Sequence, residues 1–495
     1  MIESGLFIGY FVALLVTAAV RPTAFLFLLG AALPLIVPRL NIGVGVDWFK
    51  IIGPLAIGLA VIRRGSGGVV RESRASLALW LVVYAAIVSL VWMYFEYTVL
   101  ERYRFAAAME AGTGAAQTTL KMPVQFVSML GQFLAVLAVP LWARRASDCR
   151  AALLGLACGV LTSVLAGGVY WLGTGLATVL TTGDAGVLPY AGLSIPRLGG
   201  LSGEPKSLGS VAALLLIYVV AERFYRSSLS LSRPWWLPAL LLVVFLTFST
   251  SAWSAVVLGL MGVVVLSLIW GGGRQLVILF GVVGATVVLA SSVGFIVDLV
   301  EARLIQRIFG DGDFEQQKDL YVFWVFMDQP LHSIFGFGFG GADLAVTPYM
   351  EWLHLKYKRT PTPGVTGVRL LGDLGLVGLT LLFALAMRWA RVLSGRRDRA
   401  AAAFVVGGLA ACLAGADIGL GTYFFMVGAV LAGAALERRS ARHHASPEKR
   451  PHARRGRAFP GSPRAAASLR PAPVADLRTT NGKPFVALRE RERRA

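Results

Sequence analysis

Residues 274–298 read Arg274-Gln-Leu-Val-Ile-Leu-Phe280-Gly-Val-Val-Gly-Ala-Thr-Val-Val-Leu-Ala290-Ser-Ser-Val-Gly-Phe-Ile-Val-Asp298, an almost uncharged run that is long enough to cross a bilayer as a helix. A polar stretch from Glu301 to Arg369 follows, and then a second apolar run, Leu370–Trp389. The stretch is too polar to lie in lipid, and too rich in aromatic residues and short apolar runs for a flexible linker. We therefore expect it to fold as a cap outside the membrane and to hold much of the chemistry.

The composition extends this interpretation to the whole chain. Of its 495 residues, 56% are hydrophobic and 15% are charged, whereas soluble domains are about 25% charged. Apolar runs predict an all-α polytopic membrane protein with about 12–13 transmembrane helices, because the first run could be a half-span. The predicted spans are residues 5–20, 23–38, 46–62, 77–95, 122–141, 151–172, 207–221, 235–249, 252–270, 274–298, 370–389, 400–418 and 420–437.

These spans divide the chain into four parts. Residues 1–298 are the N-terminal transmembrane helices, 299–369 the extracytoplasmic cap loop, 370–437 the C-terminal transmembrane helices and 438–495 a tail. The tail holds 16 Lys/Arg against 4 Asp/Glu of a chain whose net charge is +20. It has no apolar period, so we expect it to be disordered. Behind a membrane domain, we expect it to attract anionic lipids rather than nucleic acid.

The short loops predict the orientation in the membrane, since cytoplasmic loops carry an excess of Lys and Arg. Arginines cluster in four loops that alternate along the chain and can all face the cytoplasm: 63–76, 142–150, 222–234 and 388–399. The C-terminus then lies on the cytoplasmic side as well. The longer loops 96–121, 173–206 and 299–369 face outward.

One outward loop combines several groups that suit a phosphate ligand. It reads Pro196-Arg197-Leu-Gly-Gly200-Leu-Ser-Gly-Glu204-Pro-Lys206. Arg197 offers a planar fork of donors, the glycines allow a ligand close to the backbone, and Pro205 predicts a helix start that favours anions. The alternative is an ordinary capped helix start with an ion pair between Arg197 and Glu204.

Four further residues in or beside the cap could carry chemistry. Arg303 and Arg307 are four residues apart, so they share a helix face that could bind a diphosphate or simply be a solvated basic face. Arg369 and Asp373 lie one turn apart, as a functional pair or an intrahelical salt bridge.

Two other features of the cap have weaker signals. His332 and His354 are the outward histidines that could act as a general base. The run Gly336–Gly341 lacks the context of a nucleotide loop and is expected to be a flexible turn.

Taken in order, these pieces resemble the O-antigen ligase and polymerase superfamily of bacterial envelope glycan enzymes, over roughly Pro196 to Leu385. The resemblance rests on the 197–205 stretch, the turn Thr247-Phe-Ser-Thr-Ser-Ala-Trp253, the Asp328-Gln-Pro330 segment with the glycines 336–340, and Asp373-Leu-Gly-Leu-Val-Gly378.

The resemblance implies an enzyme of the bacterial inner membrane that transfers a glycan from an undecaprenyl-diphosphate carrier to a glycan acceptor, with no metal, cofactor or nucleotide sugar. It implies that the diphosphate is bound by Arg197, Arg303 and Arg307, and Lys206 and Arg369 are further candidates for binding the substrate. The base would be Glu204 or His354, and a chain-length regulator protein is a further candidate partner.

Two departures from the family pattern favour a polymerase of exopolysaccharide, capsule or O-antigen repeats over a ligase. Thr250 stands where the family often has an arginine, and Gly364 stands where ligases carry a histidine. The rival from another class is a transporter or flippase of lipid-linked oligosaccharide, which should place ionisable residues along a path through the membrane.

Overall fold

The residues described by the computed structural model are helical apart from two short strand pairs. They are residues 2–36, 40–41, 45–64, 76–95, 116–171, 187–190, 193–225, 227, 229–231, 233–270, 323, 326–327, 330–339, 365–395, 398–416 and 418–444. Most of the cap, the predicted span 274–298 and the tail from residue 445 lie outside the described residues.

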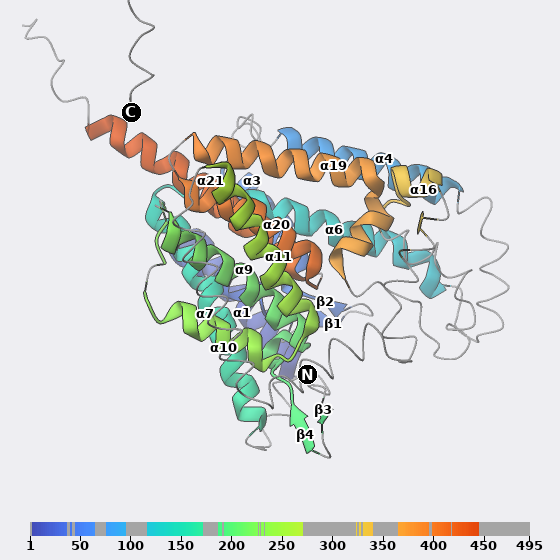
Figure 1. Cartoon of the computed structure of the whole chain (residues 1–495), viewed down its shortest axis with the longest axis horizontal. Coiled ribbons are helices and arrows are strands. Elements are labelled where there is room, and N and C mark those ends of the chain that lie inside the picture. The colour runs from blue at the N-terminus through green and yellow to red at the C-terminus, as the bar shows by residue number, and fades with distance from the viewer. Residues whose placement is uncertain are drawn as a thin grey trace, which may run out of the picture. The chain divides into compact units, whose positions relative to one another are not determined.

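The described helices follow most of the predicted spans closely (Figure 1). They are α1 (Ile2–Val20), α2 (Pro22–Ala32), α3 (Trp48–Arg64), α4 (Ser76–Phe95), α6 (Ala116–Trp142), α7 (Ala146–Trp171), α9 (Pro205–Phe224), α10 (Trp236–Leu246), α11 (Thr250–Ile269), α16 (Pro330–Phe335), α19 (Thr366–Ser394), α20 (Arg399–Ala414) and α21 (Ile418–His444). A 3-10 turn, η3 (Gly200–Ser202), precedes α9.

The strands form two separate antiparallel pairs. Strand β1 (Leu40–Asn41) pairs with β2 (Gly45–Val46), and β3 (Val187–Tyr190) pairs with β4 (Leu193–Pro196). The second pair leads directly into the loop that carries Arg197.

Five described helices are long and apolar enough to cross a membrane: Ala146–Val169, Pro205–Phe224, Thr250–Ile269, Thr366–Ser394 and Ile418–Ser440. Helix α11 also exposes large apolar side chains, among them Val257, Met261 and Leu268, which would be costly in water over so large a face. These helices agree with the predicted helical membrane protein.

Helices α2 and α10 are shorter than the predicted spans 23–38 and 235–249. Each has 11 residues, which extend about 16 Å, roughly half the thickness of a bilayer core. Apolar sequence continues past both helix ends, but Pro34 cannot donate a backbone hydrogen bond and Phe248 adopts a positive φ of 44°. Hydropathy alone therefore overestimated these two helices.

Arginines at one end of the bundle are fixed by neighbouring helices. Arg63, at the end of α3, donates to Ala18 O at 2.9 Å and lies over the Trp142 ring. Arg399, which begins α20, lies over the Trp270 ring. Each contact ties an arginine at a helix end to a neighbouring helix; the sidedness of the arginine-rich loops stays a prediction.

Glycines bring α9, α11 and α20 into close contact. A Cβ on Gly407 of α20 would lie 2.5 Å from Gly259 O of α11, and one on Gly262 would lie 2.8 Å from the Cα of Gly407. On α9, a Cβ at Gly209 would lie 2.4 Å from the Cβ of Ala252. Small residues of this kind allow helices to pack backbone to backbone in a membrane.

Helices α3 and α6 show the same close approach at Gly53 and Gly131. A Cβ on Gly53 would lie 2.5 Å from Gly131 O, and one on Gly131 would lie 1.9 Å from Lys50 O. By contrast, a Cβ on Gly58, also in α3, would have no atom within 4 Å.

This contrast predicts that Gly53→Ala destabilises the protein and that Gly58→Ala does not. The added methyl at position 53 forces α3 and α6 apart, and overpacking of this kind costs about 1–3 kcal/mol. Thermal unfolding in detergent, followed by tryptophan fluorescence, should show a lower Tm for Gly53→Ala only. Equal melting temperatures for the two variants would contradict the packing described here.

Candidate functional site

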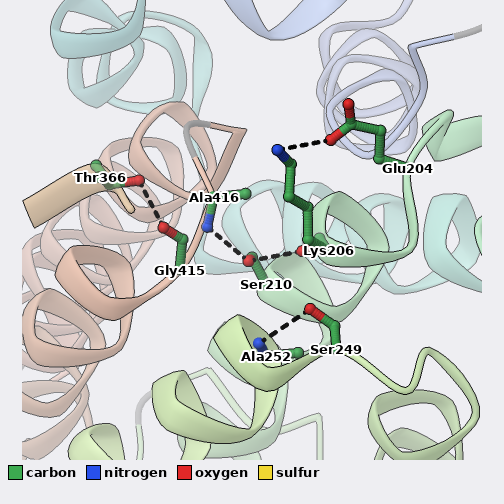
Figure 2. Close-up of polar contacts among 8 residues, drawn as sticks. All are labelled: Glu204, Lys206, Ser210, Ser249, Ala252, Thr366, Gly415 and Ala416. Atoms are coloured by element: carbon green, nitrogen blue, oxygen red, sulfur yellow. Dashed lines mark hydrogen bonds and ion pairs between the residues drawn. The ribbon is translucent and has the colours of Figure 1, made fainter. Parts of the chain in front are cut away.

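Four helices begin close to one another at the end of the bundle opposite the arginine-rich turns. Hydrogen bonds join three of these starts (Figure 2). Ser210 of α9 donates to Lys206 O at 2.8 Å and accepts the Ala416 N–H, just before α21, at 2.8 Å. Thr366, which begins α19, donates to Gly415 O through its hydroxyl at 2.8 Å and its N–H at 3.0 Å.

The fourth start belongs to α11, which lies against α9 at this end. The Ser249 hydroxyl accepts the Ala252 N–H at 3.4 Å and so caps α11. This explains the hydroxyl-rich turn that the sequence placed between two spans. Helix starts carry unpaired N–H groups and a partial positive charge, so their convergence favours an anionic ligand.

Glu204 and Lys206 flank the first residue of α9 and pair with each other. The Lys206 Nζ lies 3.0 Å from the Glu204 carboxylate, and the side chains are 40% and 59% exposed respectively. A pair this exposed is worth at most about 1 kcal/mol. Glu204 occupies the N-cap position without accepting a cap hydrogen bond from its own helix. Its carboxylate is thus accessible to a ligand that displaces Lys206.

Arg197 is half-buried beside the end of α10. Its Nε donates to Thr247 O at 3.2 Å, and the next residue, Leu198, donates its N–H to Leu246 O at 3.1 Å. These bonds fix the arginine between the loop before α9 and the turn before α11. The two motifs that the sequence analysis connected only by resemblance, 197–205 and 247–253, are therefore in contact.

The loop between Arg197 and Glu204 is fixed on α7. Ser202 donates to Ser163 Oγ through its N–H at 3.0 Å, and its hydroxyl reaches Pro34 O at 2.5 Å. Gly200 has a φ of +53°, and a Cβ there would lie 1.8 Å from Ser163 O. The glycines of this loop predict room for a ligand close to the backbone, but at Gly200 the close neighbour is α7.

Arg369 and Asp373 form a buried pair one turn apart on α19. The Nε of Arg369 lies 3.8 Å from the Asp373 carboxylate, and the residues are 4% and 0% exposed. The intrahelical pair expected from the spacing is present. Arg369 lies one turn after Thr366. It is therefore one turn away from the starts of α9, α19 and α21, which hydrogen bonds connect and which we call the joined helix starts.

Helix α19 breaks two residues after Asp373. Gly375 has φ +63° and ψ −175°, a conformation that is costly for other residues. The carbonyl groups before the break are bonded to other segments: Phe337 N–H donates to Gly372 O at 2.7 Å and Gly338 N–H to Asp373 O at 2.8 Å. Sequence reasoning missed this break.

The partners at the break come from the glycine run, which we call the clasp (residues 336–339). The clasp is buried between α19 and α4, and Phe339 N–H donates to Ser89 Oγ of α4 at 2.8 Å. The expected flexible turn is therefore wrong for these residues. The signal that could have found the clasp is its glycine spacing, because Gly336 and Gly338 both have positive φ.

Three candidate residues lie outside the described part of the chain. They are Arg303, Arg307 and His354. The side chain of His332, on α16, is not described either. The structure thus brings Arg197, Glu204, Lys206 and Arg369 to one end of the bundle, and their relation to the cap arginines stays a prediction.

No protein-family model matches this sequence, and no curated protein is significantly similar to it.

The buried pair on α19 predicts a strong coupling between its two residues. Asp373→Asn alone should destabilise the protein by about 3–5 kcal/mol, because it leaves the Arg369 charge buried beside a neutral amide. The double variant Arg369→Met, Asp373→Leu should recover most of that loss. Unfolding of Arg369→Met, Asp373→Leu and their double variant measures the coupling, and simply additive losses would show that the charges do not stabilise each other.

Proposed function

We propose that the chain is a multi-pass protein of the bacterial inner membrane with about 12–13 spans, a folded outer cap at 299–369, and a disordered basic tail on the cytoplasmic side. Arg63 at the end of α3 and Arg399 at the start of α20, each over a tryptophan ring, support this orientation, since basic residues favour the cytoplasmic face. The joined helix starts then face outward, at the level where a lipid headgroup meets the protein.

We further propose that the protein is a polysaccharide polymerase that transfers glycan repeats from an undecaprenyl-diphosphate carrier to a growing acceptor. The observation that carries this proposal is the meeting of Arg197, Lys206 and four helix starts at one end of an apolar bundle. A diphosphate on a lipid arrives from within the bilayer. It needs cations and oriented N–H groups at the membrane edge, and this end supplies both.

The main contribution that the protein would make to this reaction is to stabilise the negative charge that develops on the leaving diphosphate. The acceptor hydroxyl attacks the anomeric carbon of the donor sugar, and the bond from that carbon to the diphosphate oxygen breaks with its electron pair on the leaving diphosphate. Arg197, Lys206 and Arg369 would stabilise the leaving charge, together with Arg303 and Arg307 of the cap. The hydroxyl proton would pass to Glu204, whose carboxylate is exposed, or to His354 of the cap.

A transporter of lipid-linked oligosaccharide is the second candidate, because transporters bind substrate at broken helices and α19 is broken. In transporters, however, the freed backbone groups face a cavity and bind the substrate or ion. Here Gly372 O and Asp373 O accept bonds from the clasp. The break in α19 is filled by the chain itself, which favours the enzyme.

The polymerase proposal predicts a glycan ladder from the purified protein in vesicles that contain a lipid-diphosphate oligosaccharide repeat of the host, without nucleotide sugar and with EDTA. Arg197→Ala should reduce the rate roughly 100-fold, as loss of one stabilising donor does in other enzymes. Arg391→Ala, on an exposed arginine at the far end of α19, is the control and should retain the ladder.

The other outcomes of this assay separate the alternatives. A single transfer onto a different acceptor, with no ladder, would identify a ligase. Movement of the lipid-linked repeat across the bilayer without a new glycosidic bond would support the transporter.

A second prediction concerns Glu204 as the base. Glu204→Gln keeps the side-chain shape but cannot accept the proton, so kcat should fall by about 10²–10⁴-fold with little change in Tm. The control is Glu222→Gln at the other end of α9, where the carboxylate accepts the Leu231 N–H. A wild-type rate for Glu204→Gln would leave His354 as the remaining base candidate.

A further inference from the structure

Helix α19 is bent (Figure 1), and its break lies at Gly375. The first part of α19, residues 366–374, is therefore a short helix whose direction the rest of α19 does not fix. Its orientation therefore depends on what holds its two ends. Since this short helix carries both Arg369 and Asp373, the same contacts decide where the charged pair points.

The two ends are held by different segments. At the start, Thr366 makes two hydrogen bonds to Gly415 O. At the end, the clasp bonds to the carbonyl groups of Gly372 and Asp373, the second of which belongs to the pair itself. A movement of the clasp would consequently move the backbone of Asp373 and, through its carboxylate, the guanidinium of Arg369.

Two residues of α4, Tyr84 and Ser89, form hydrogen bonds with the clasp or with the residue just before it. Ser89 accepts the Phe339 N–H at 2.8 Å. The half-buried Tyr84 places its hydroxyl 2.8 Å from Phe335 O, immediately before the clasp, and 3.1 Å from Leu374 O, immediately before the break. The phenol has one proton, which can serve either carbonyl group, so Tyr84 bridges the two segments at the joint.

We propose that Tyr84 is a positioning residue for the proposed glycan transfer: by joining the clasp to the break in α19, it holds the Arg369–Asp373 pair toward the joined helix starts. The assignment rests on the function proposed above for that site. Tyr84 itself is not placed against the substrate. Its effect reaches the reaction through the backbone of α19, and it should appear where Arg369 contributes most, in the stabilisation of the leaving diphosphate.

The test compares Tyr84→Phe with Tyr10→Phe. Tyr10 is a matched control because its hydroxyl also donates to a backbone carbonyl of another helix, Leu28 O at 2.6 Å, between α1 and α2. Two quantities are measured for each variant: the hydrogen exchange of the Phe337 and Gly338 amides, and the steady-state kinetics of ladder formation from the lipid-diphosphate oligosaccharide repeat.

Tyr84→Phe should accelerate exchange of both amides and lower kcat, each by about three- to tenfold, which is the net effect of one hydrogen bond. The KM for the lipid-linked repeat should change less than about twofold, because the lost contribution is largest in the transition state. Tyr10→Phe should leave the exchange of these amides and kcat at their wild-type values.

A second variant disturbs the clasp at its contact with Ser89 of α4. Gly338 has a φ of +78°, and a Cβ there would lie 2.4 Å from the Cα of Ser89. Gly338→Ala should therefore lower kcat further than Tyr84→Phe. Gly168→Ala is its control, because a Cβ at Gly168 has no neighbour within 4 Å.

Three other outcomes would contradict the assignment of Tyr84 as a positioning residue. Faster amide exchange with unchanged kcat would show that the clasp does not position the pair, and the proposed function would be untouched. Unchanged exchange in Tyr84→Phe would show that Tyr84 does not hold the clasp. The absence of any ladder from the wild-type protein would remove the proposed function and this assignment together, while the exchange data would still describe the clasp.

Discussion

A carbonyl group inside an apolar bundle requires a donor, and the break at Gly375 frees carbonyl groups that the helix itself can no longer satisfy. The chain meets this requirement with backbone N–H groups of the clasp and with the hydroxyl of Tyr84. Because the donors come from residues 84 and 337–338, the break draws three distant segments together. These hydrogen bonds join α4, α16 and the short first part of α19.

Charge is sorted along the bundle in a way that agrees with the proposed orientation. Arg63 and Arg399 each lie over a tryptophan ring beside the arginine-rich turns, while Arg197, the starts of α9, α19 and α21, and the Glu204–Lys206 pair lie at the other end. Between them the helices are almost free of charge. At the end with Arg197, an anion would meet this guanidinium and Lys206 beside the exposed Glu204 carboxylate.

The sequence predicted those features that depend on local chemistry. Pro205 marked the start of α9, the spacing of Arg369 and Asp373 predicted their pairing, and apolar runs located most helices. It failed where the outcome depends on backbone groups, which have no side-chain signature. The clasp was taken for a flexible turn because its partners on α19 lie more than 30 residues away. Helices α2 and α10 were overestimated because hydropathy does not register a helix end.

The glycine contacts among α9, α11 and α20 have a mechanical consequence. Where Gly259, Gly262 and Gly407 bring two backbones together, one helix cannot slide past the other without a clash between backbone atoms. These three helices must therefore move as a unit, or not at all. Any movement within the described bundle therefore falls to the helices around these three.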